Sequence, residues 1–277
     1  MKNFLIIANE YKDPEAAYTR QIMSYLGEHG ARRVISMLLG DESRDRKIDI
    51  PYGIEAILVL GGDGTMLQAA RATQSSRVPL LGVNLGTLGY LTEVETDDIE
   101  NAIDRLMRDD YVIEERMMLK GIAGDHVGSA LNDIVVTRTG KLQIIRFDVY
   151  VNGILLNSFV ADGIICATPT GSTSYSLSAG GPVVEPGART ILLTPICAHT
   201  FHSRSIVLSP EDEVVIELCK GSGDRTQTAE VSFDGTDNIP LEAGDRVTIT
   251  RAVETAKIIK LSQESFLNVL SRKMSGN

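Results

Sequence analysis

The stretch EAILVLGGDGTMLQAAR, which spans residues 55–71, limits the possible folds of this chain more than any other. It begins with a short, wholly apolar run at 56–60, as expected for a strand buried on both faces of a parallel sheet. Three glycines within four positions follow, with Asp63 among them, and the next residues are good helix formers. The sequence therefore predicts a strand, a glycine-rich turn and a helix, in that order.

The glycine-rich turn has the properties of a phosphate-binding site, with one exception. Glycine lets backbone N–H groups approach an anion closely, and a helix N-terminus adds unpaired donors. The turn contains no lysine, and the first basic residue after it is Arg71, so it is not a P-loop. Instead, Asp63 places a negative charge there, which indicates a residue that handles a proton or Mg²⁺. In the alternative interpretation, Asp63 or Thr65 only caps the helix, and the glycines only form a tight turn.

Composition argues against several classes of protein. The chain has 277 residues, of which 43% are hydrophobic and 23% are charged, as in a soluble globular protein. No apolar run approaches the roughly 18 residues of a membrane-spanning helix, and the apolar segment near Met1 is too short for a signal peptide. Three cysteines without a CxxC pair indicate the reducing cytoplasm, and a formal net charge of -10 argues against general binding of nucleic acid.

The order of the predicted elements divides the chain into two parts. Residues 1–112 alternate strands with helices, which predicts a doubly wound, Rossmann-like α/β domain around the glycine-rich turn. Residues 113–255 contain successive strand-like segments, including a hairpin signal at Asn152-Gly153, and predict a β-rich, sandwich-like domain. Residues 256–277 contain a short amphipathic helix that we expect to pack back on the first domain.

A second motif follows an apolar strand in the β-rich part. Residues 161–182 read ADGIICATPTGSTSYSLSAGGP, a segment crowded with hydroxyl groups and glycines. Hydroxyls and exposed N–H groups suit ribose and phosphate oxygens, Tyr175 adds an aromatic face, and Asp162 offers an acceptor to sugar hydroxyls or an amide. Such composition is also typical of a solvent-exposed loop. The length of the segment favours a functional role.

Together these motifs resemble those of one kinase family. GGDGT alone is shared with diacylglycerol and sphingosine kinases and, in a close variant, with phosphofructokinases. Its combination with the second motif, with Asn132-Asp133, with NLGTLGYLTE at 84–93 and with TPICAHTFHSR at 194–204 closely resembles the bacterial NAD kinases, over roughly residues 55–240. The resemblance implies that ATP phosphorylates the 2′-hydroxyl of the adenosine ribose of NAD, giving NADP and ADP.

The resemblance also implies roles for residues of the first part. Asp63 matches the catalytic acid, which would take the proton from the ribose hydroxyl. Gly64 would help to hold the diphosphate, and Tyr90 would lie beside the adenine. Because the turn itself contains no lysine, we expect Mg²⁺ to be obligatory for the reaction.

In the β-rich part, the resemblance implies that Asn132 and Asp133 bind ribose hydroxyls, that Asp162 lies near the nicotinamide half of NAD, and that Asp234 lies near the phosphates and the metal. The residues that would line the adenine and nicotinamide pockets are Thr173, Ser174, Tyr175 and Ser178. Two positions depart from the family. Asp133 stands where Glu is more frequent, and Ser174 stands where Ala is more frequent, so its additional hydroxyl must be hydrogen-bonded or exposed.

The predicted partners are therefore NAD and ATP, with neither nucleic acid nor membrane, and the resemblance implies a homodimer or homotetramer. Two alternatives stay open. A lipid kinase shares the glycine-rich turn, but the acidic composition and the hydroxyl-rich motif argue against it. A non-catalytic sensor of NAD(P) is the second, although an intact Asp63 argues against the loss of catalysis. Cys197, His199 and His202 are close in sequence, but their spacing and the lack of a fourth ligand favour structural roles over a metal site.

Overall fold

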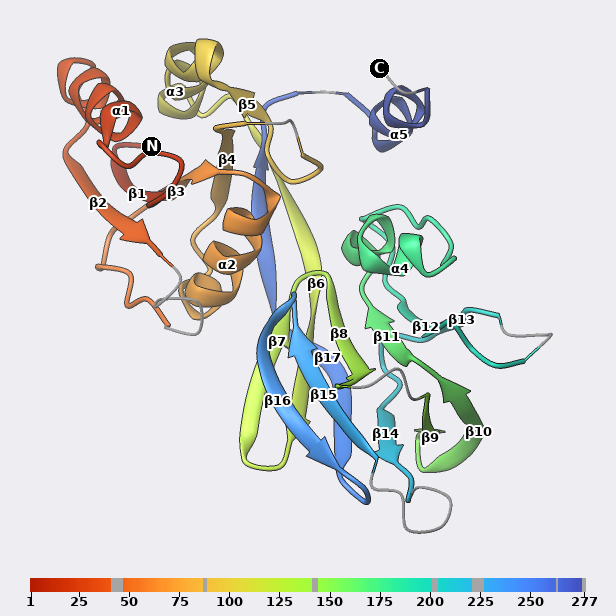
Figure 1. The fold of residues 1–277 in the computed structure, drawn as a ribbon. Coiled ribbons are helices and arrows are strands. Elements are labelled where there is room, and N and C mark those ends of the chain that lie inside the picture. Colours follow the sequence, from red (N-terminus) through yellow and green to blue (C-terminus); the bar gives the residue numbers. More distant parts are fainter. Residues whose placement is uncertain are drawn as a thin grey trace. The chain divides into compact units, whose positions relative to one another are not determined.

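The computed structural model describes residues 1–40, 47–86, 89–140, 144–200, 204–220, 227–262 and 264–275. The chain forms two compact units, coloured by sequence in Figure 1. Unit 1 consists of Met1–Arg116 with Thr255–Asn277, and unit 2 consists of Met117–Glu254. The chain passes between the units within two long strands, β6 (Val112–Ala123) and β17 (Arg246–Lys260).

Unit 1 is the predicted doubly wound α/β domain. Its parallel strands pair in the order β2-β1-β3-β4, with β5 and the end of β17 also paired to β4. Every residue of β3 is buried, as its apolar sequence predicted. The helices cover both faces of the sheet, with α1 and α3 on one face and α2 on the other (Figure 1). The elements are β1 (Asn3–Asn9), α1 (Ala17–Glu28), β2 (Arg33–Leu39), β3 (Ala56–Gly61), α2 (Asp63–Thr73), β4 (Leu80–Asn84), β5 (Val94–Glu95) and α3 (Ile99–Met107).

Unit 2 is the predicted β-rich domain. One antiparallel sheet has the order β13-β12-β11-β8-β15-β16, and a second group of strands has the order β10-β9-β14-β17. Side chains of both groups, among them Phe147, Ile216, Ile164 and Phe233, form one buried core, which makes the unit a sandwich. Its elements are β7 (His126–Ala130), β8 (Asp133–Arg138), β9 (Ile145–Val151), β10 (Ile154–Ala161), β11 (Gly163–Ala167), α4 (Tyr175–Ser178), β12 (Ile191–Ile196), β13 (Ile206–Leu208), β14 (Val214–Leu218), β15 (Thr228–Phe233) and β16 (Thr236–Glu242).

Local backbone conformation and side-chain hydrogen bonds set the ends of two elements. The hairpin at Asn152-Gly153 is confirmed, and both residues have the positive φ that this turn requires. The first helix begins at Ala17, because Ala16 adopts φ 52° and Asp13 accepts hydrogen bonds from the backbone N–H groups of the first turn.

The C-terminal helix, α5 (Phe266–Met274), is present and begins at Ser265, whose hydroxyl accepts from the N–H of Asn268. In the described part of the chain, no helix is long and apolar enough to cross a membrane.

One aromatic ring sets the geometry at the end of β15. Phe233 is fully buried, and its ring lies over Gly121 of β6 and Gly128 of β7, which pair with each other across the hairpin. A Cβ at Gly121 would lie 2.7 Å from Phe233 Cε1, and one at Gly128 would lie 2.8 Å from Phe233 Cδ1. Both positions therefore require glycine for close packing. Asp234 follows Phe233 directly in the chain, and its backbone N–H donates to the carbonyl of Asp133 at 2.9 Å.

We therefore expect Gly121→Ala to lower the free energy of unfolding by about 1 to 3 kcal/mol, because the added methyl group must displace the ring. Gly187→Ala is the matched control, because nothing lies within 4 Å of the added Cβ there. Its effect should stay within about 0.5 kcal/mol. Urea unfolding of both variants measures the difference, and equal effects would show that this packing does not constrain the strand.

Candidate active site

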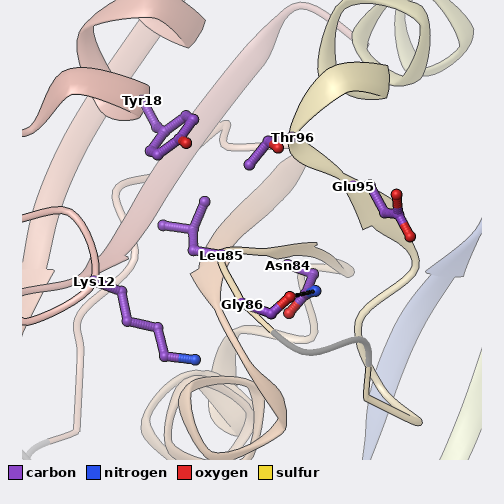
Figure 2. A pocket seen from close by; sticks show the side chains of 7 residues that line it. All are labelled: Lys12, Tyr18, Asn84, Leu85, Gly86, Glu95 and Thr96. Carbon is purple, nitrogen blue, oxygen red and sulfur yellow. Dashed lines mark hydrogen bonds between the residues drawn. The ribbon is translucent and has the colours of Figure 1, made fainter.

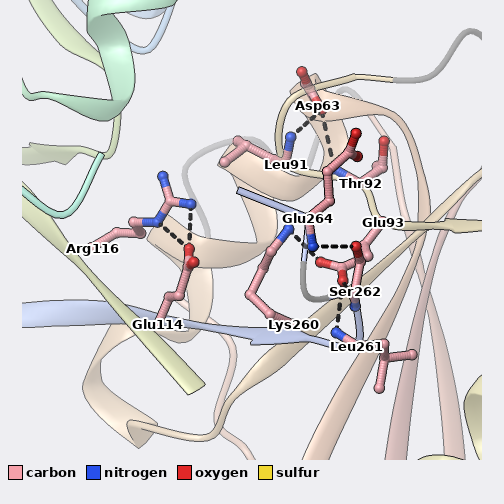
Figure 3. A network of polar contacts seen from close by, with 10 residues as sticks. All are labelled: Asp63, Leu91, Thr92, Glu93, Glu114, Arg116, Lys260, Leu261, Ser262 and Glu264. Atoms are coloured by element: carbon pink, nitrogen blue, oxygen red, sulfur yellow. Dashed lines mark hydrogen bonds and ion pairs between the residues drawn. The ribbon is translucent and has the colours of Figure 1, made fainter. Parts of the chain in front are cut away.

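Asp63 is fixed by a loop that comes from another part of unit 1. Its Oδ2 accepts a hydrogen bond from the backbone N–H of Tyr90 at 2.7 Å. Its Oδ1 accepts from the N–H of Leu91 at 2.9 Å and from that of Thr92 at 3.3 Å. Figure 3 shows this carboxylate beside Leu91 and Thr92. The Asp63 carboxylate thus accepts hydrogen bonds from three consecutive backbone N–H groups, and these bonds fix the position of the loop that carries Tyr90.

The start of α2 shows that Asp63 does not serve as the helix cap. Gly62 is the N-cap residue, and its N–H donates weakly to Thr65 Oγ1 at 3.5 Å. The loop approaches so closely that a Cβ at Gly89 would lie 1.9 Å from Asp63 Oδ1. The interpretation of Asp63 as a mere cap is therefore wrong, because its carboxylate points to the loop instead. Gly64 is exposed as the second residue of α2.

A second acid anchors the same loop to the end of β17. Glu93 Oε1 accepts from the backbone N–H groups of Leu261, at 2.6 Å, and of Ser262, while its Oε2 forms an ion pair with Lys260 (Figure 3). The Glu93 side chain is only 6% exposed. The loop at 89–92 is therefore fixed at one end by Asp63 and at the other by Glu93.

A lysine from the first βα connection reaches the glycine-rich turn. A Cβ at Gly62 would lie 2.9 Å from Lys12 Nζ, and one at Gly86 would lie 3.5 Å from it. The turn contains no lysine of its own, but the fold supplies one. The requirement for Mg²⁺ therefore stays a prediction, and Lys12 adds a positive charge that the turn itself does not contain. Sequence analysis missed Lys12 because about fifty positions separate it from the turn, although both follow parallel strands that pair with each other.

Unit 2 repeats the arrangement of Asp63. Asp234 adopts φ 51°, and its carboxylate accepts from the N–H groups of Leu131, Asn132 and Asp133 at 2.8, 2.7 and 3.1 Å. The two implied ribose-binding residues are thus held in place by a third residue of the implied site. Asp162 lies apart from this arrangement, and its Oδ1 accepts from Arg138 Nε at 2.7 Å. Arg138 is a partner that sequence analysis did not identify.

Asp133 is the most unusual carboxyl group of the site. It is 4% exposed, and its Oδ2 has no hydrogen-bond partner in the described part of the chain. Burial, and then the charge of Asp234, raises the pKa of Asp133 to about 7. A buried acceptor without a donor is costly, so this oxygen suits a hydroxyl group of a ligand.

The hydroxyl-rich segment is not a solvent loop. It folds into a 3-10 turn at Thr170–Thr173 followed by α4. Thr168, Ser172 and Ser176 are fully buried, and their hydroxyls bond within unit 2, for example Thr168 Oγ1 to the carbonyl of Leu131 at 2.6 Å. The residues that the sequence placed in the nucleotide pockets are instead partly or fully exposed: Thr173, Ser174, Tyr175 and Ser178. The additional hydroxyl of Ser174 is therefore accommodated without burial.

The structure thus divides the implied residues between the units. Unit 1 carries Asp63, Gly64 and Tyr90, and unit 2 carries the other eight. In the described part of the chain, no group of three or more His, Cys, Asp or Glu side chains is arranged to hold a metal ion. His202 lies outside the described residues.

Comparison with known proteins identifies the family. Residues 41–111 match the model of the ATP-NAD kinase N-terminal domain, and residues 131–261 match that of the ATP-NAD kinase C-terminal domain. A protein of Agathobacter rectalis named NAD kinase is 49% identical over 99% of both chains. One of Lachnospira eligens with the same name is 41% identical over 99% of this chain and 100% of its own.

Solved structures share the fold. Yeast NADH kinase, in complex with NADH, superposes with a TM-score of 0.81 at 24% identity, over 99% of this chain and 88% of its own. An NAD kinase from Archaeoglobus fulgidus, in complex with ATP, gives a TM-score of 0.78 at 24% identity, over 98% of this chain and 99% of its own. The two domain models and the bacterial relatives together confirm the resemblance found in the motifs, and this chain belongs to the ATP-NAD kinase family.

Proposed function

We propose that this protein transfers the terminal phosphoryl group of ATP to the 2′-hydroxyl of the adenosine ribose of NAD, giving NADP and ADP. The observation that carries the proposal is the position of Asp63, a carboxylate in the first turn of α2 that three backbone N–H groups fix. Membership of the family and the relatives named NAD kinase support the choice of substrates.

Asp63 has the properties that a general base requires. The three N–H groups fix the orientation of the carboxylate. Oδ1 accepts two of them and Oδ2 accepts one, so Oδ2 keeps a lone pair that can accept a hydroxyl proton. The side chain is only partly buried, so a substrate hydroxyl has access to it. Asp63 would take the proton of the 2′-hydroxyl while the oxygen attacks the phosphorus atom and ADP leaves.

We expect Mg²⁺ to bind together with ATP rather than to stay bound to the protein in the absence of ATP. Mg²⁺ is commonly bound by one or two carboxylates together with the substrate phosphates, and Asp63 is the carboxylate that the glycine-rich turn offers. Bound with ATP, it supplies charge neutralisation on the phosphoryl oxygens. Lys12 adds a positive charge from the protein itself.

Asp133 and Asn132 would bind ribose hydroxyls in unit 2, and the partly exposed hydroxyl residues of α4 would contact the nucleotide. The open Oδ2 of Asp133 supports this role, because a ribose hydroxyl is the donor that it lacks. Such a donor stabilises the ionised carboxyl group, so binding of NAD and loss of the Asp133 proton should be linked.

The cytoplasm and a homo-oligomeric state belong to the same proposal. The three cysteines are free, as expected in a reducing compartment. The edge strand β10 supports self-association, since Ile154 and Leu155 are 74% and 51% exposed.

The role of Asp63 is tested by comparing Asp63→Asn with Gly89→Ala. Asn can accept from the N–H groups on one side only, because its NH₂ group would face a backbone donor, so this substitution disturbs the loop as well as removing the base. Gly89→Ala keeps the carboxyl group but shifts it together with the loop, because the added Cβ would lie 1.9 Å from Asp63 Oδ1. If Asp63 is the base, kcat should fall by about 10²-fold or more in Asp63→Asn, well beyond the loss in Gly89→Ala.

The measurement is NADP formation, read with an NADP-specific dehydrogenase, together with an NAD-induced shift in Tm to show that both variants still bind. A kcat of Asp63→Asn close to that of the wild-type protein would contradict the role of Asp63 as the base. Retention of binding without any NADP in the wild-type protein would instead support the sensor alternative.

The buried Asp133 predicts a specific dependence of stability on pH. Its pKa is raised from 3.8 to about 7 in the folded state, so the folded protein binds more protons than the unfolded chain between these values. The penalty is therefore absent below about pH 4, grows as pH rises, and is complete above about pH 7. One pKa unit corresponds to about 1.4 kcal/mol, so the full effect is on the order of 4 kcal/mol.

Asp133→Asn should remove this dependence, so its free energy of unfolding relative to wild type should rise between pH 4 and pH 7 and then level off. Asp125→Asn, an equal change of charge at an exposed turn of the same unit, is the control. Urea unfolding at several pH values measures both. A constant difference between Asp133→Asn and wild type across this range would contradict the assignment.

A further inference from the structure

Glu93 is a buried acid that does not belong to the implied site residues. Its side chain is 6% exposed, and burial of a carboxylate is costly unless donors compensate for it. The donors are the backbone N–H groups of Leu261, at 2.6 Å, and Ser262, together with the ammonium group of Lys260 (Figure 3). All three come from one segment, the last residue of β17 and the two residues that follow it.

Glu93 is joined directly to the loop that binds Asp63. Three consecutive loop residues donate their backbone N–H groups to Asp63, and Thr92, the last of them, precedes Glu93. The same stretch packs closely on β4, because the N–H of Glu93 donates to the carbonyl of Gly82 at 3.0 Å. A Cβ at Gly82 would lie 2.9 Å from Thr92 Cα. A displacement of Glu93 therefore moves Thr92, and with it the donors of Asp63.

A continuous set of contacts thus connects Asp63 to the end of β17. The loop fixes the Asp63 carboxylate, Glu93 fixes the end of the loop, and the backbone of Leu261 and Ser262 fixes Glu93. A general base has to stay within hydrogen-bonding distance of the hydroxyl group from which it takes a proton. A misplacement of about 1 Å can lower a rate about 100-fold, even when the change lies far from the reacting atoms. The anchor of the loop therefore matters for the reaction as well as for stability.

We propose that Glu93 is a positioning residue for phosphoryl transfer, and that it acts through its hydrogen bonds with the backbone of Leu261 and Ser262. The proposal rests on the function proposed above, because it takes Asp63 as the base. It adds a residue that touches neither substrate and whose anchor lies 168 positions further along the chain. Because β17 begins in unit 2 and ends in unit 1, the base is anchored to a strand that both units share.

Glu93→Leu and Glu93→Gln separate positioning from packing. Leucine has a similar volume but accepts no hydrogen bond, whereas the glutamine Oε1 can still accept from both N–H groups. We expect kcat to fall about 10-fold in Glu93→Leu and to stay within about 3-fold of wild type in Glu93→Gln. KM for NAD and KM for ATP should stay within about 2-fold in both variants, because no contact with a substrate is lost.

The control has to lie away from the nucleotide-binding surroundings. Glu95 is unsuitable, because it lines a pocket of unit 1 together with Lys12 and Asn84 (Figure 2). The Oδ1 of Asn84 has no hydrogen-bond partner in the described part of the chain, and this pocket belongs to the site already described. Glu100→Gln, an equal change of charge at an exposed position of α3, is the matched control and should behave as wild type.

Ser262 tests the same anchor from its other side. Ser262→Pro removes the backbone N–H that donates to Glu93, whereas Ser262→Ala keeps it. Both variants lose the hydroxyl that accepts from the N–H of Glu264, and Ser262 is exposed, so the comparison isolates the N–H group. We expect kcat to fall about 3-fold in Ser262→Pro but not in Ser262→Ala. Equal kcat values in these two variants would overturn the proposal, and the pair decides it if Glu93→Leu does not fold.

Hydrogen exchange gives a readout that does not require turnover. The N–H groups of Tyr90, Leu91 and Thr92 should exchange faster in Glu93→Leu than in the wild-type protein, and Glu93→Gln should resemble the wild type. Unchanged exchange in Glu93→Leu, an unchanged kcat in this variant, or an equally low kcat in Glu93→Gln would overturn the proposal. If the wild-type protein forms no NADP while exchange changes as expected, the proposed function fails and the anchoring of the loop stands.

Discussion

In each unit, one carboxylate accepts hydrogen bonds from three consecutive backbone N–H groups, and the implied site residues of that unit depend on it. Asp63 holds Tyr90, Leu91 and Thr92 in unit 1, and Asp234 holds Leu131, Asn132 and Asp133 in unit 2. Three charge-assisted hydrogen bonds offset the cost of removing a carboxylate from water, and they also fix loops that have no regular secondary structure. The side chain that is proposed to act as base thus also fixes the loop around it, so removing it is expected to change both the chemistry and the local structure.

Lys12 places a positive charge beside the glycine-rich turn, whereas the protein as a whole is negatively charged. A net charge of -10 repels nucleotides at long range, so affinity must come from donors at short range. Unit 1 offers such donors at the carboxyl ends of β1, β3 and β4, where Lys12, Gly62 and Gly86 meet. Adjacent parallel strands bring their carboxyl ends to one edge of a sheet, and the fold can therefore supply a lysine that the glycine-rich turn lacks.

Sequence reasoning succeeded where the signal was local and failed where it was not. The buried strand, the turn and the helix at 56–73 follow from periodicity and glycine, and the hairpin at Asn152-Gly153 follows from two residues. The position of Lys12, the open Oδ1 of Asn84 and the ion pair of Asp162 with Arg138 depend on contacts between distant segments, which composition and spacing do not encode. The hydroxyl-rich segment shows both cases, since its composition predicted a polar role but not that Ser172 and Ser176 would be buried as structural groups.

The most direct measurement is ³¹P NMR of the products formed by the purified protein from NAD, ATP and Mg²⁺. The account predicts one equivalent of ADP for each new 2′-phosphomonoester on the adenosine ribose, and no product when the metal is chelated. ADP without a new phosphomonoester, or a phosphate at any other position of NAD, would contradict the assignment of both the reaction and the acceptor hydroxyl.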